Sequence, residues 1–393
     1  MRLSFFNYHY NIEGTARGAA AQVQAITTGL TQRGHQVDLR FRAAKEPGEE
    51  RTYGGLKKIG WLRRYGHVPR LLLRNVSLFQ QECRLLAAFR PDVVLAVSSY
   101  CNFSALLAAR YRRLPFVLFC EAPLEYEYSL FFAQYRSYPY LGRWIEGINV
   151  RAADQVICIS EILKGYMIRY GGPATKLHVV PNGVDHRAFQ PRPADKEIRA
   201  RFHLQDRLVI GFVGTFNFFA DVETFSETVR MVCDCHPEVV FFFVGKGEAS
   251  EQIRRAGEDR CLSNHLVFAG AVPHEEVPRY LSMMDIVISP YRGDYLFYGS
   301  PMKLLEYMAA GKATLATALG QIKEVASDGY NAILFEPGDD VALRRKLLTL
   351  IENEELRQRL GANARKTIEN DWTWDTQVSR IVAILRLAAE GRR

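Results

Sequence analysis

The sequence predicts an α/β protein made of two doubly wound domains, each built around a parallel sheet. Short apolar runs alternate with longer amphipathic stretches along the chain, which is typical of repeated strand–helix units. Runs such as DVVLAVSS, VVFFFVG and DIVISP show no alternation of polar and apolar residues, so these strands should be covered on both faces. The length of 393 residues fits two domains of ordinary size.

The pattern places six strands in each half of the chain. In the first half, strands are expected near 2–9, 36–42, 92–99, 116–122, 155–160 and 177–182. In the second half they are expected near 207–214, 239–245, 266–272, 285–291, 313–319 and 332–337. A helix is expected over 19–33 with Val23, Ile26 and Leu30 on one face, and Gly34 ends it.

A domain boundary is predicted where the composition changes after the segment VVPNGVD. The next residues, HRAFQPRPADKE, are charged and contain Pro191 and Pro193, which suits a linker. We therefore expect domains at 1–185 and 186–370, with a last helix at about 371–393 that packs back on the first domain. That helix should bury Val378, Ile381, Val382 and Leu385. A ligand is expected in the cleft between the domains, at the carboxyl ends of the strands.

Composition narrows the class of protein further. The first residues carry no secretory signal pattern, and no stretch of about 18 apolar residues occurs. Seven cysteines are scattered singly except for Cys233 and Cys235, which suits a reducing cytoplasm. There is no Asp-x-Asp pair and no cluster of ligands at metal spacing, so no metal and no other cofactor is expected.

The net charge of +8 is unevenly distributed. Residues 51–90 hold nine Lys/Arg against one acid, Glu82, and Leu56, Ile59, Leu62 and Tyr65 recur along one side of a short helix. Basic side chains beside exposed aliphatic and aromatic ones favour an anionic membrane surface, although a solvated basic face over a core helix would give the same pattern. No nucleic-acid-binding motif accompanies the charge. We expect a cytoplasmic protein, peripheral on the inner face of the cell membrane.

The segment GSPMKLLEYMAAGK at 299–312 carries the main chemical signal. Ser300 is a good N-cap residue, Pro301 suits the first turn of a helix of about ten residues, and Gly311 can end it. The amides of Met302, Lys303 and Leu304, with the Lys303 charge, can bind phosphate oxygens. Glu306 lies on the same side of the helix as Lys303 and can accept hydrogen bonds from two ribose hydroxyls. An ordinary capped surface helix remains an alternative.

The same segment, SPMKLLEYMAAGKATLAT, resembles the donor-binding signature of the family-4 retaining glycosyltransferases, in the variant that reads Ser-Pro-x-Lys-x-x-Glu-Tyr. The likeness extends in order over nearly the whole chain except about 43–90. Its other parts are RGAAAQVQAITTGLTQRGHQVDL, VLFCEAPLEYE, VVPNGVDHRAF, VIGFVGTFN, VFFFVGKGE and LVFAGAVPHEEVPRYLSMMDIVISP.

This resemblance implies a GT-B fold of two Rossmann-like domains and metal-independent, retaining transfer from a nucleoside-diphosphate sugar, UDP- or GDP-linked. It also implies an acceptor hydroxyl on a glycan or a lipid-linked molecule, in envelope or exopolysaccharide synthesis. The chain departs from the family where many members carry phosphate-binding cations or an acid, at Thr215, about Ala220 and Tyr298. We expect Lys303, with Lys246 or Arg292, to supply the missing charge.

Further site residues are expected at strand ends. Glu13, Gly14, Arg17 and Gly18 lie between the first strand and helix, where the glycines allow a diphosphate or sugar to approach. Gly211, Gly214, Gly245 and Gly247 are expected to end strands of the second domain, and Val272 to frame the base. Glu121 stands near the position where the family often has histidine, and is expected to hold the acceptor or a sugar hydroxyl. Each of these residues also has a purely structural interpretation.

Two other functions fit the same domains. A sugar-nucleotide epimerase can share the architecture, and would act without an acceptor. A catalytically weak nucleotide-sugar-binding protein or partner subunit would fit the departures at Thr215, Ala220 and Tyr298. A nicotinamide dehydrogenase is disfavoured because the Gly-x-Gly-x-x-Gly spacing is missing.

Overall fold

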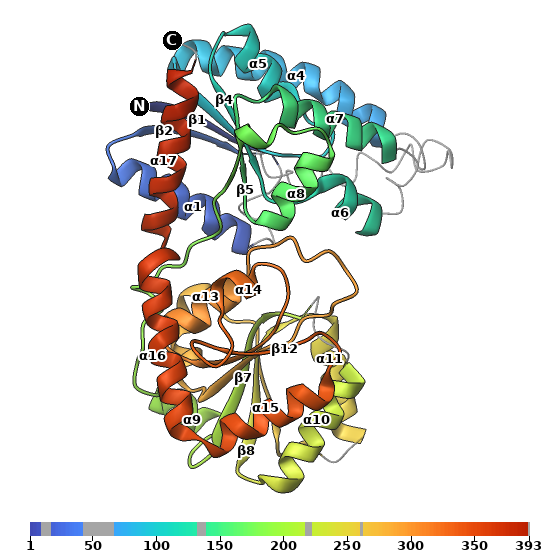
Figure 1. Ribbon diagram of the computed structural model, residues 1–393, viewed down its shortest axis with the longest axis vertical. Coiled ribbons are helices and arrows are strands. Elements are labelled where there is room, and N and C mark those ends of the chain that lie inside the picture. The colour runs from blue at the N-terminus through green and yellow to red at the C-terminus, as the bar shows by residue number, and fades with distance from the viewer. Residues whose placement is uncertain (9–16, 42–66, 132–138, 217–221, 260–261, 392–393) are drawn as a thin grey trace. The chain divides into compact units, whose positions relative to one another are not determined.

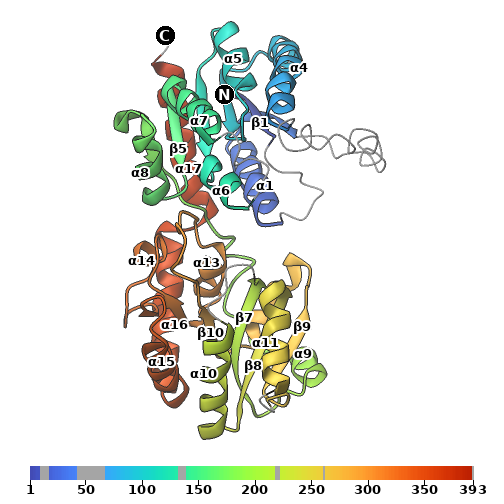
Figure 2. The ribbon, with the colours of Figure 1, turned by 90° about the vertical axis from the view of Figure 1, so that its right-hand side faces the viewer.

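The computed structural model describes residues 1–8, 17–41, 67–131, 139–216, 222–259 and 262–391. These residues divide into two compact units, Met1–Pro181 with Trp374–Arg393, and Asn182–Thr373. Each unit contains a six-stranded parallel sheet with helices packed on it (Figures 1 and 2). All twelve predicted strands are confirmed, each within a few residues of the expected bounds.

The sheet of the first unit has the order β2-β1-β3-β4-β5-β6. Its strands are β1 (Arg2–Asn7), β2 (Gln36–Phe41), β3 (Val93–Val97), β4 (Phe116–Cys120), β5 (Gln155–Cys158) and β6 (Leu177–Val179). The connecting helices are α1 (Arg17–Gln32), α4 (His67–Phe89), α5 (Ser104–Tyr111), α6 (Leu124–Phe131), α7 (Pro139–Ala152), α8 (Glu161–Arg169) and the short η3 (Ala174–Lys176). Every residue of β3 and β4 is buried, as the unbroken apolar runs predict.

The last helix, α17 (Trp374–Glu390), packs against α1 and the strands of the first unit. Its predicted inward residues Val378, Ile381, Val382 and Leu385 are buried. The helices approach closely at Gly29, where an added Cβ would lie 2.8 Å from a methyl of Val378. Beside this contact the Arg33 guanidinium pairs with Asp375 at 2.6 Å.

The sheet of the second unit has the order β12-β11-β10-β7-β8-β9. Its strands are β7 (Leu208–Thr215), β8 (Val239–Lys246), β9 (Leu266–Gly270), β10 (Ile286–Ser289), β11 (Ala313–Thr317) and β12 (Ile333–Phe335). Its helices are α9 (Lys196–Arg201), α10 (Val222–Cys235), α11 (Glu248–Asp259), η4 (His274–Glu276), α12 (Val277–Ser282), α13 (Met302–Ala309), α14 (Ile322–Val325), α15 (Asp340–Glu352) and α16 (Glu354–Asp371). The order reverses between β7 and β10, and ligands of open α/β sheets bind at the carboxyl ends of strands at such a switch point.

Alternate residues of β8 feed two separate cores, which explains its unbroken run of apolar residues. Phe241 and Phe243 pack with α10, α11 and α15 on one face of the sheet. Val240 and Phe242 pack with α12, α13 and α16 on the other. Both faces are therefore covered, and the strand ends are left as the places where a ligand can reach this unit.

Several local expectations need correction or lie outside the described residues. Gly211 does not end a strand, because it lies inside β7, where an added Cβ would meet the Met284 sulfur at 2.0 Å. The helix proposed through Leu56 and Tyr65 is outside the described residues. In the described part of the chain no helix has the length and apolar character needed to cross a membrane.

Candidate functional site

The candidate site is built around the start of α13, which follows the switch-point strand β10. The predicted N-cap is wrong: Pro301 occupies that position and caps nothing with its side chain. The Ser300 hydroxyl instead accepts a hydrogen bond from the backbone N–H of Asn182 at 3.1 Å. The helix consequently begins at Met302, one residue later than expected, and ends before Gly311, which has the predicted left-handed backbone.

Two of the three predicted phosphate-binding amides are open. The Met302 amide is not, because it donates to the Ser300 carbonyl at 2.9 Å. Among the described residues, the amides of Lys303 and Leu304 have no acceptor. Both lie in the first turn of the helix, where unbonded amides and the helix dipole attract an anion.

Tyr307 fixes the helix against the central strand β7. Its hydroxyl donates to the carbonyl of Val213 at 2.8 Å and accepts from the amide of Val213 at 2.7 Å. Tyr307 is fully buried, as are Leu304 and Leu305, and burial raises the pKa of the Tyr307 phenol. The start of α13 is therefore positioned by a buried, doubly hydrogen-bonded side chain. This residue was not identified from the sequence, because its partner lies 94 residues away.

Lys303 extends from α13 across the carboxyl end of β7. Its Nζ donates to the Thr215 carbonyl at 3.2 Å and lies 4.7 Å from the centre of the Phe212 ring and 5.0 Å from that of Tyr291. The two aromatic faces favour a cation at this point. A side chain at Gly214 would block the path, since an added Cβ would lie 2.3 Å from the Lys303 Cδ.

Three glycines let β7 and β8 end close together beside Lys303. Gly214, Gly245 and Gly247 all have positive φ, a backbone conformation that favours glycine. An added Cβ at Gly245 would lie 1.9 Å from the Gly214 carbonyl oxygen, and one at Gly247 would lie 2.8 Å from the Phe216 nitrogen. Lys246 sits between two of them and is exposed. The glycines thus serve close packing of the chain around Lys303.

Glu306 lies one turn along α13 and is mostly buried, with 12% of its side chain exposed. Burial raises the pKa of its carboxyl to about 8, while the Lys303 charge opposes this shift. Its Oε1 lies 3.6 Å from Nε2 of His274, and burial lowers the pKa of that histidine. His274 was not identified from the sequence, where it reads as one polar residue of a turn.

Other residues of this unit, the predicted Val272 and Arg292 among them, take simpler positions. Val272 is half-buried and packs against the core that contains α13. Arg292 pairs with Asp294, so its charge is already engaged within the loop. Asp185 shapes the turn after β6 by accepting from the amides of Arg187 and Ala188 at 3.1 and 3.0 Å. Of the three predicted cations, Lys303, Lys246 and Arg292, Lys303 is the one that the structure shows in contact with the carboxyl end of β7.

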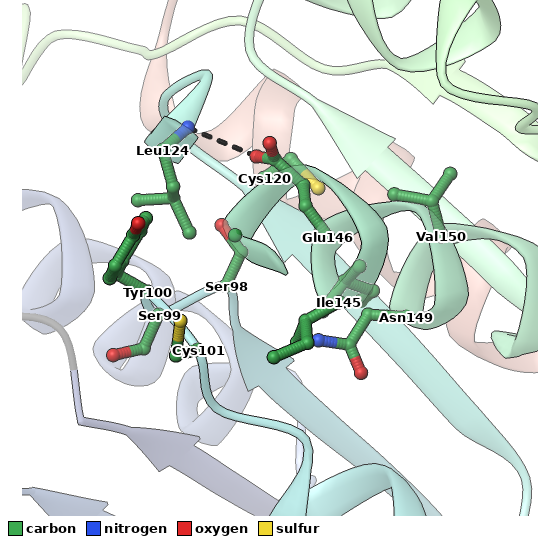
Figure 3. Close-up of a pocket in the computed structure, with 12 residues that line it drawn as sticks. Ser98, Ser99, Tyr100, Cys101, Cys120, Leu124, Ile145, Glu146, Asn149 and Val150 are labelled. Atoms are coloured by element: carbon green, nitrogen blue, oxygen red, sulfur yellow. Dashed lines mark hydrogen bonds between the residues drawn. The ribbon is translucent and has the colours of Figure 1, made fainter. Parts of the chain in front are cut away.

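Glu121 belongs to the first unit and is buried directly after β4. The next turn leads into α6, whose first amide, that of Leu124, donates to Oε1 of Glu146 at 3.0 Å (Figure 3). Glu146 comes from α7 and lines a small pocket with Ser98 and Asn149, which has room for about one water molecule. Burial raises the pKa of Glu146 to about 8, against hydrogen bonds from the amides of Leu124 and Glu125.

Another buried carboxyl, that of Glu82 on α4, lies in the same unit. It accepts a hydrogen bond from the Ser104 hydroxyl at 2.9 Å, and burial raises its pKa to about 7. Neither Glu82 nor Glu146 was singled out, because a glutamate in a helix ordinarily reads as a surface residue. Glu13 and Gly14 lie outside the described residues, and of Arg17 and Gly18 only the backbone, at the start of α1, is described. In the described ranges no three His, Cys, Asp or Glu side chains group as a metal site.

Two family models match the chain in sequence. Residues 16–188 match Glycosyltransferase Family 4, and residues 194–367 match Glycosyl transferases group 1. An uncharacterized glycosyltransferase of Methanocaldococcus jannaschii is 28% identical over 58% of this chain and 57% of its own length. A GDP-mannose-dependent alpha-(1-6)-phosphatidylinositol monomannoside mannosyltransferase of Mycolicibacterium smegmatis is 26% identical over 61% and 64%. The chain thus spans about three fifths of the length of the curated relatives it matches.

Solved structures share the fold at low identity. Anabaena HepE in complex with UDP has a TM-score of 0.68 at 18% identity, covering 98% of this chain and all of that one. Sucrose-phosphate synthase of Thermosynechococcus elongatus has a TM-score of 0.71 at 16% identity, covering 98% of each chain. The two parallel six-stranded sheets are the two Rossmann-like units of the GT-B fold. The chain therefore carries a Glycosyltransferase Family 4 domain ahead of a Glycosyl transferases group 1 domain.

Proposed function

We propose that the protein transfers a sugar from a nucleoside-diphosphate sugar, UDP- or GDP-linked, to a hydroxyl of a glycan or lipid-linked acceptor, with retention and without a metal. The observation that carries this proposal is the arrangement on α13. Two open amides and Lys303 lie at the carboxyl end of β7, and Glu306 lies one turn further along. A diphosphate fits the first group and a ribose fits the second.

In this proposal the leaving diphosphate is stabilised by the α13 amides and Lys303. Charge develops on the leaving oxygen as the glycosidic bond breaks, and preorganised donors at that point lower the barrier. Lys303 is already held by Thr215 and two aromatic rings, so little reorganisation is needed. Glu121, buried after β4, is proposed to orient the acceptor or a sugar hydroxyl.

The named relatives support a nucleotide-sugar donor but differ among themselves. One is GDP-mannose-dependent and acts on a phosphatidylinositol monomannoside, and another is the sulfoquinovosyl transferase of Arabidopsis thaliana. One structural neighbour is bound to UDP-glucose. We therefore retain both UDP- and GDP-linked sugars as candidate donors, and favour an acceptor that is a glycan or is lipid-linked.

The first test is nucleotide binding, measured by calorimetry and thermal shift with UDP, GDP, ADP and their sugars. We expect one base to bind selectively, with affinity lost in Glu306→Ala. Glu352→Ala is a matched control, because Glu352 is an exposed glutamate of the same unit on α15. If no nucleotide binds, the proposal is wrong.

Product analysis then separates transfer from its alternatives. Transfer requires an acceptor and yields a glycoside with the donor's anomeric configuration. Conversion of the sugar nucleotide without any acceptor would indicate an epimerase. Tight binding with no turnover across a panel of glycan and lipid-linked acceptors would indicate a binding protein, which the engagement of Arg292 by Asp294 would help explain.

We also propose that the first unit associates with an anionic membrane through the 51–90 segment. In its described part, α4 exposes Leu73 and Val76, at 72% and 59%, and it also exposes Arg84 more than two turns further along the helix. Apolar and basic side chains on one helix suit an interfacial position. Sedimentation with anionic vesicles should exceed that with neutral vesicles and fall for Leu73→Ser/Val76→Ser. Equal sedimentation with both vesicle types would contradict the proposal.

A further inference from the structure

His274 and Glu306 form a pair of facing ionisable side chains within the candidate site. Glu306 lies on α13, and His274 opens η4 in the segment after β9. Their facing atoms, Nε2 and Oε1, are 3.6 Å apart. Among the described residues the Glu306 carboxyl has no hydrogen-bond donor of its own, and His274 faces it from another element. A small side-chain movement would bring the two atoms into hydrogen-bond contact.

His274 is held in place by the segment that opens the second unit. Its ring packs against that of Phe189, with centroids 5.4 Å apart, and Phe189 is buried. The guanidinium of Arg365 on α16 donates to the carbonyls of His186 and Phe189 at 2.7 and 2.8 Å. It also donates to the Ala309 carbonyl at the end of α13, at 2.8 Å. One guanidinium therefore ties the support of His274 to the helix that carries Glu306.

The charges around the pair favour a neutral state in the absence of ligand. Burial raises the pKa of Glu306 to about 8, opposed by Lys303 on the same helix. Partial desolvation lowers the pKa of His274, whose side chain is 47% exposed, and the charges of Glu275 and Asp185 oppose this shift. At neutral pH the pair then holds one proton, on the carboxyl of Glu306. A neutral carboxyl can accept fewer hydrogen bonds from a vicinal diol than a carboxylate can.

We propose that His274 is a positioning residue that takes the proton of Glu306 when a nucleotide binds. In this step the O–H bond of Glu306 breaks and an N–H bond forms on Nε2 of His274, whose other hydrogen is on Nδ1. Both carboxylate oxygens then accept hydrogen bonds from the ribose hydroxyls, and the imidazolium stays beside them. Hydrogen bonds donated by the ribose hydroxyls favour the ionised form of Glu306, and the carboxylate beside it favours the protonated histidine. This inference rests on the proposed function.

The consequence is that nucleotide binding needs no exchange of a proton with solvent. Without His274, Glu306 would have to release its proton to the buffer before both oxygens could accept. Binding to a His274→Gln variant should then be linked to release of about one proton below pH 8, and should weaken about tenfold for each pH unit of further acidification. The wild-type affinity should change little over the same range.

The test is calorimetric titration of UDP and of GDP in buffers that differ in ionisation enthalpy, between pH 6 and 8. We expect no net proton release for the wild type and about one for His274→Gln. His236→Gln is a matched control, since His236 also faces a carboxylate, Glu238 at 3.2 Å, but before the start of β8. In the wild type, the NMR signals of His274 should move toward the protonated form when the nucleotide is added.

The possible outcomes separate failure of the proposed role of His274 from failure of the proposed function. If neither nucleotide binds to the wild type, the proposed function itself fails. If the nucleotide binds and His274→Gln shows the wild-type proton count, His274 does not take the proton. A variant that binds weakly by the same factor at every pH would show that His274 has only a structural role.

Discussion

Lys303 is the residue on which the proposed chemistry depends most. Its ammonium group is held between Phe212, Tyr291 and the Thr215 carbonyl at the start of α13. Lys303→Ala should cost about 2–4 kcal/mol of transition-state stabilisation, or roughly 30- to 1,000-fold in kcat/KM. Lys246→Ala is the matched control, because that exposed lysine lies at the end of β8. An unchanged rate for Lys303→Ala, with loss in Lys246→Ala, would transfer the role to Lys246.

The buried carboxyl of Glu146 should make the stability of the folded protein depend on pH. Its pKa is about 8 in the folded protein and about 4.5 when exposed, so the folded state binds the proton more tightly. The stabilising effect is complete below about pH 4.5 and is lost as the pH rises through 8, by roughly 5 kcal/mol. Glu146→Gln keeps the acceptor for the Leu124 amide but cannot ionise.

The measurement is the stability of the α6–α7 region, followed by hydrogen exchange between pH 5 and 8.5. After correction for the intrinsic exchange rate, protection should fall with pH in the wild type and fall less in Glu146→Gln. Glu161→Gln, at an exposed glutamate of α8, should leave the profile unchanged. A wild-type profile that is flat would contradict the buried proton.

At the scale of elements, α13 is positioned by one phenol. Tyr307→Phe leaves the buried amide and carbonyl of Val213 without their side-chain partner. Leaving buried polar groups without a partner costs about 1–3 kcal/mol, so we expect the free energy of unfolding of the second unit to fall by about that amount. Because the start of α13 would be released with it, nucleotide affinity should also fall. Denaturant unfolding and calorimetry measure the two effects.

Tyr330→Phe is the matched control for this prediction. Tyr330 belongs to the same unit, is 54% exposed and therefore should lose little on removal of its hydroxyl. Equal stability of the two variants would show that the contact of Tyr307 with β7 contributes nothing net. A loss of stability without a loss of affinity would separate the packing of α13 from its ligand contacts.

At the scale of the whole molecule, the fold was predictable because the strands are continuous apolar runs. DVVLAVSS and VVFFFVG became β3 and β8, buried on both faces, and Gly34 and Gly311 ended helices as expected. The sequence did not predict the bounds of the long helix α4, because arginines and other polar residues interrupt its apolar residues over 23 positions. Local sequence patterns were therefore enough to predict the strands and these helix ends.

The site was less predictable because its contacts join distant residues. The sequence placed Lys303 and Glu306 on one helix, and they lie there. It assigned the Ser300 hydroxyl to the helix start, whereas Asn182, 118 residues away, donates to it. The contacts of Tyr307 with Val213 and of His274 with Glu306 depend on how separate elements pack, which no local pattern encodes.

The packing of α17 on the first unit gives the last prediction, made with two helical glycines. Alanine in place of an exposed helical glycine normally stabilises by roughly 0.5–1 kcal/mol. Gly165→Ala in α8 should follow this rule, since an added Cβ there meets nothing within 4 Å. Gly29→Ala should have the opposite sign, because its Cβ would lie 2.8 Å from a methyl of Val378, a side chain with little rotational freedom.

Hydrogen exchange resolved by peptide can follow the two units separately. In Gly29→Ala, protection should fall across α1, α17 and the first sheet, while the peptides of Asn182–Thr373 and nucleotide affinity should keep their wild-type values. That result would mean that the last 20 residues contribute to the stability of the first unit, although they follow the second in sequence. A fall in protection through both units together would instead mean that they unfold as one cooperative body, and α17 would then couple nucleotide binding to the stability of the first unit.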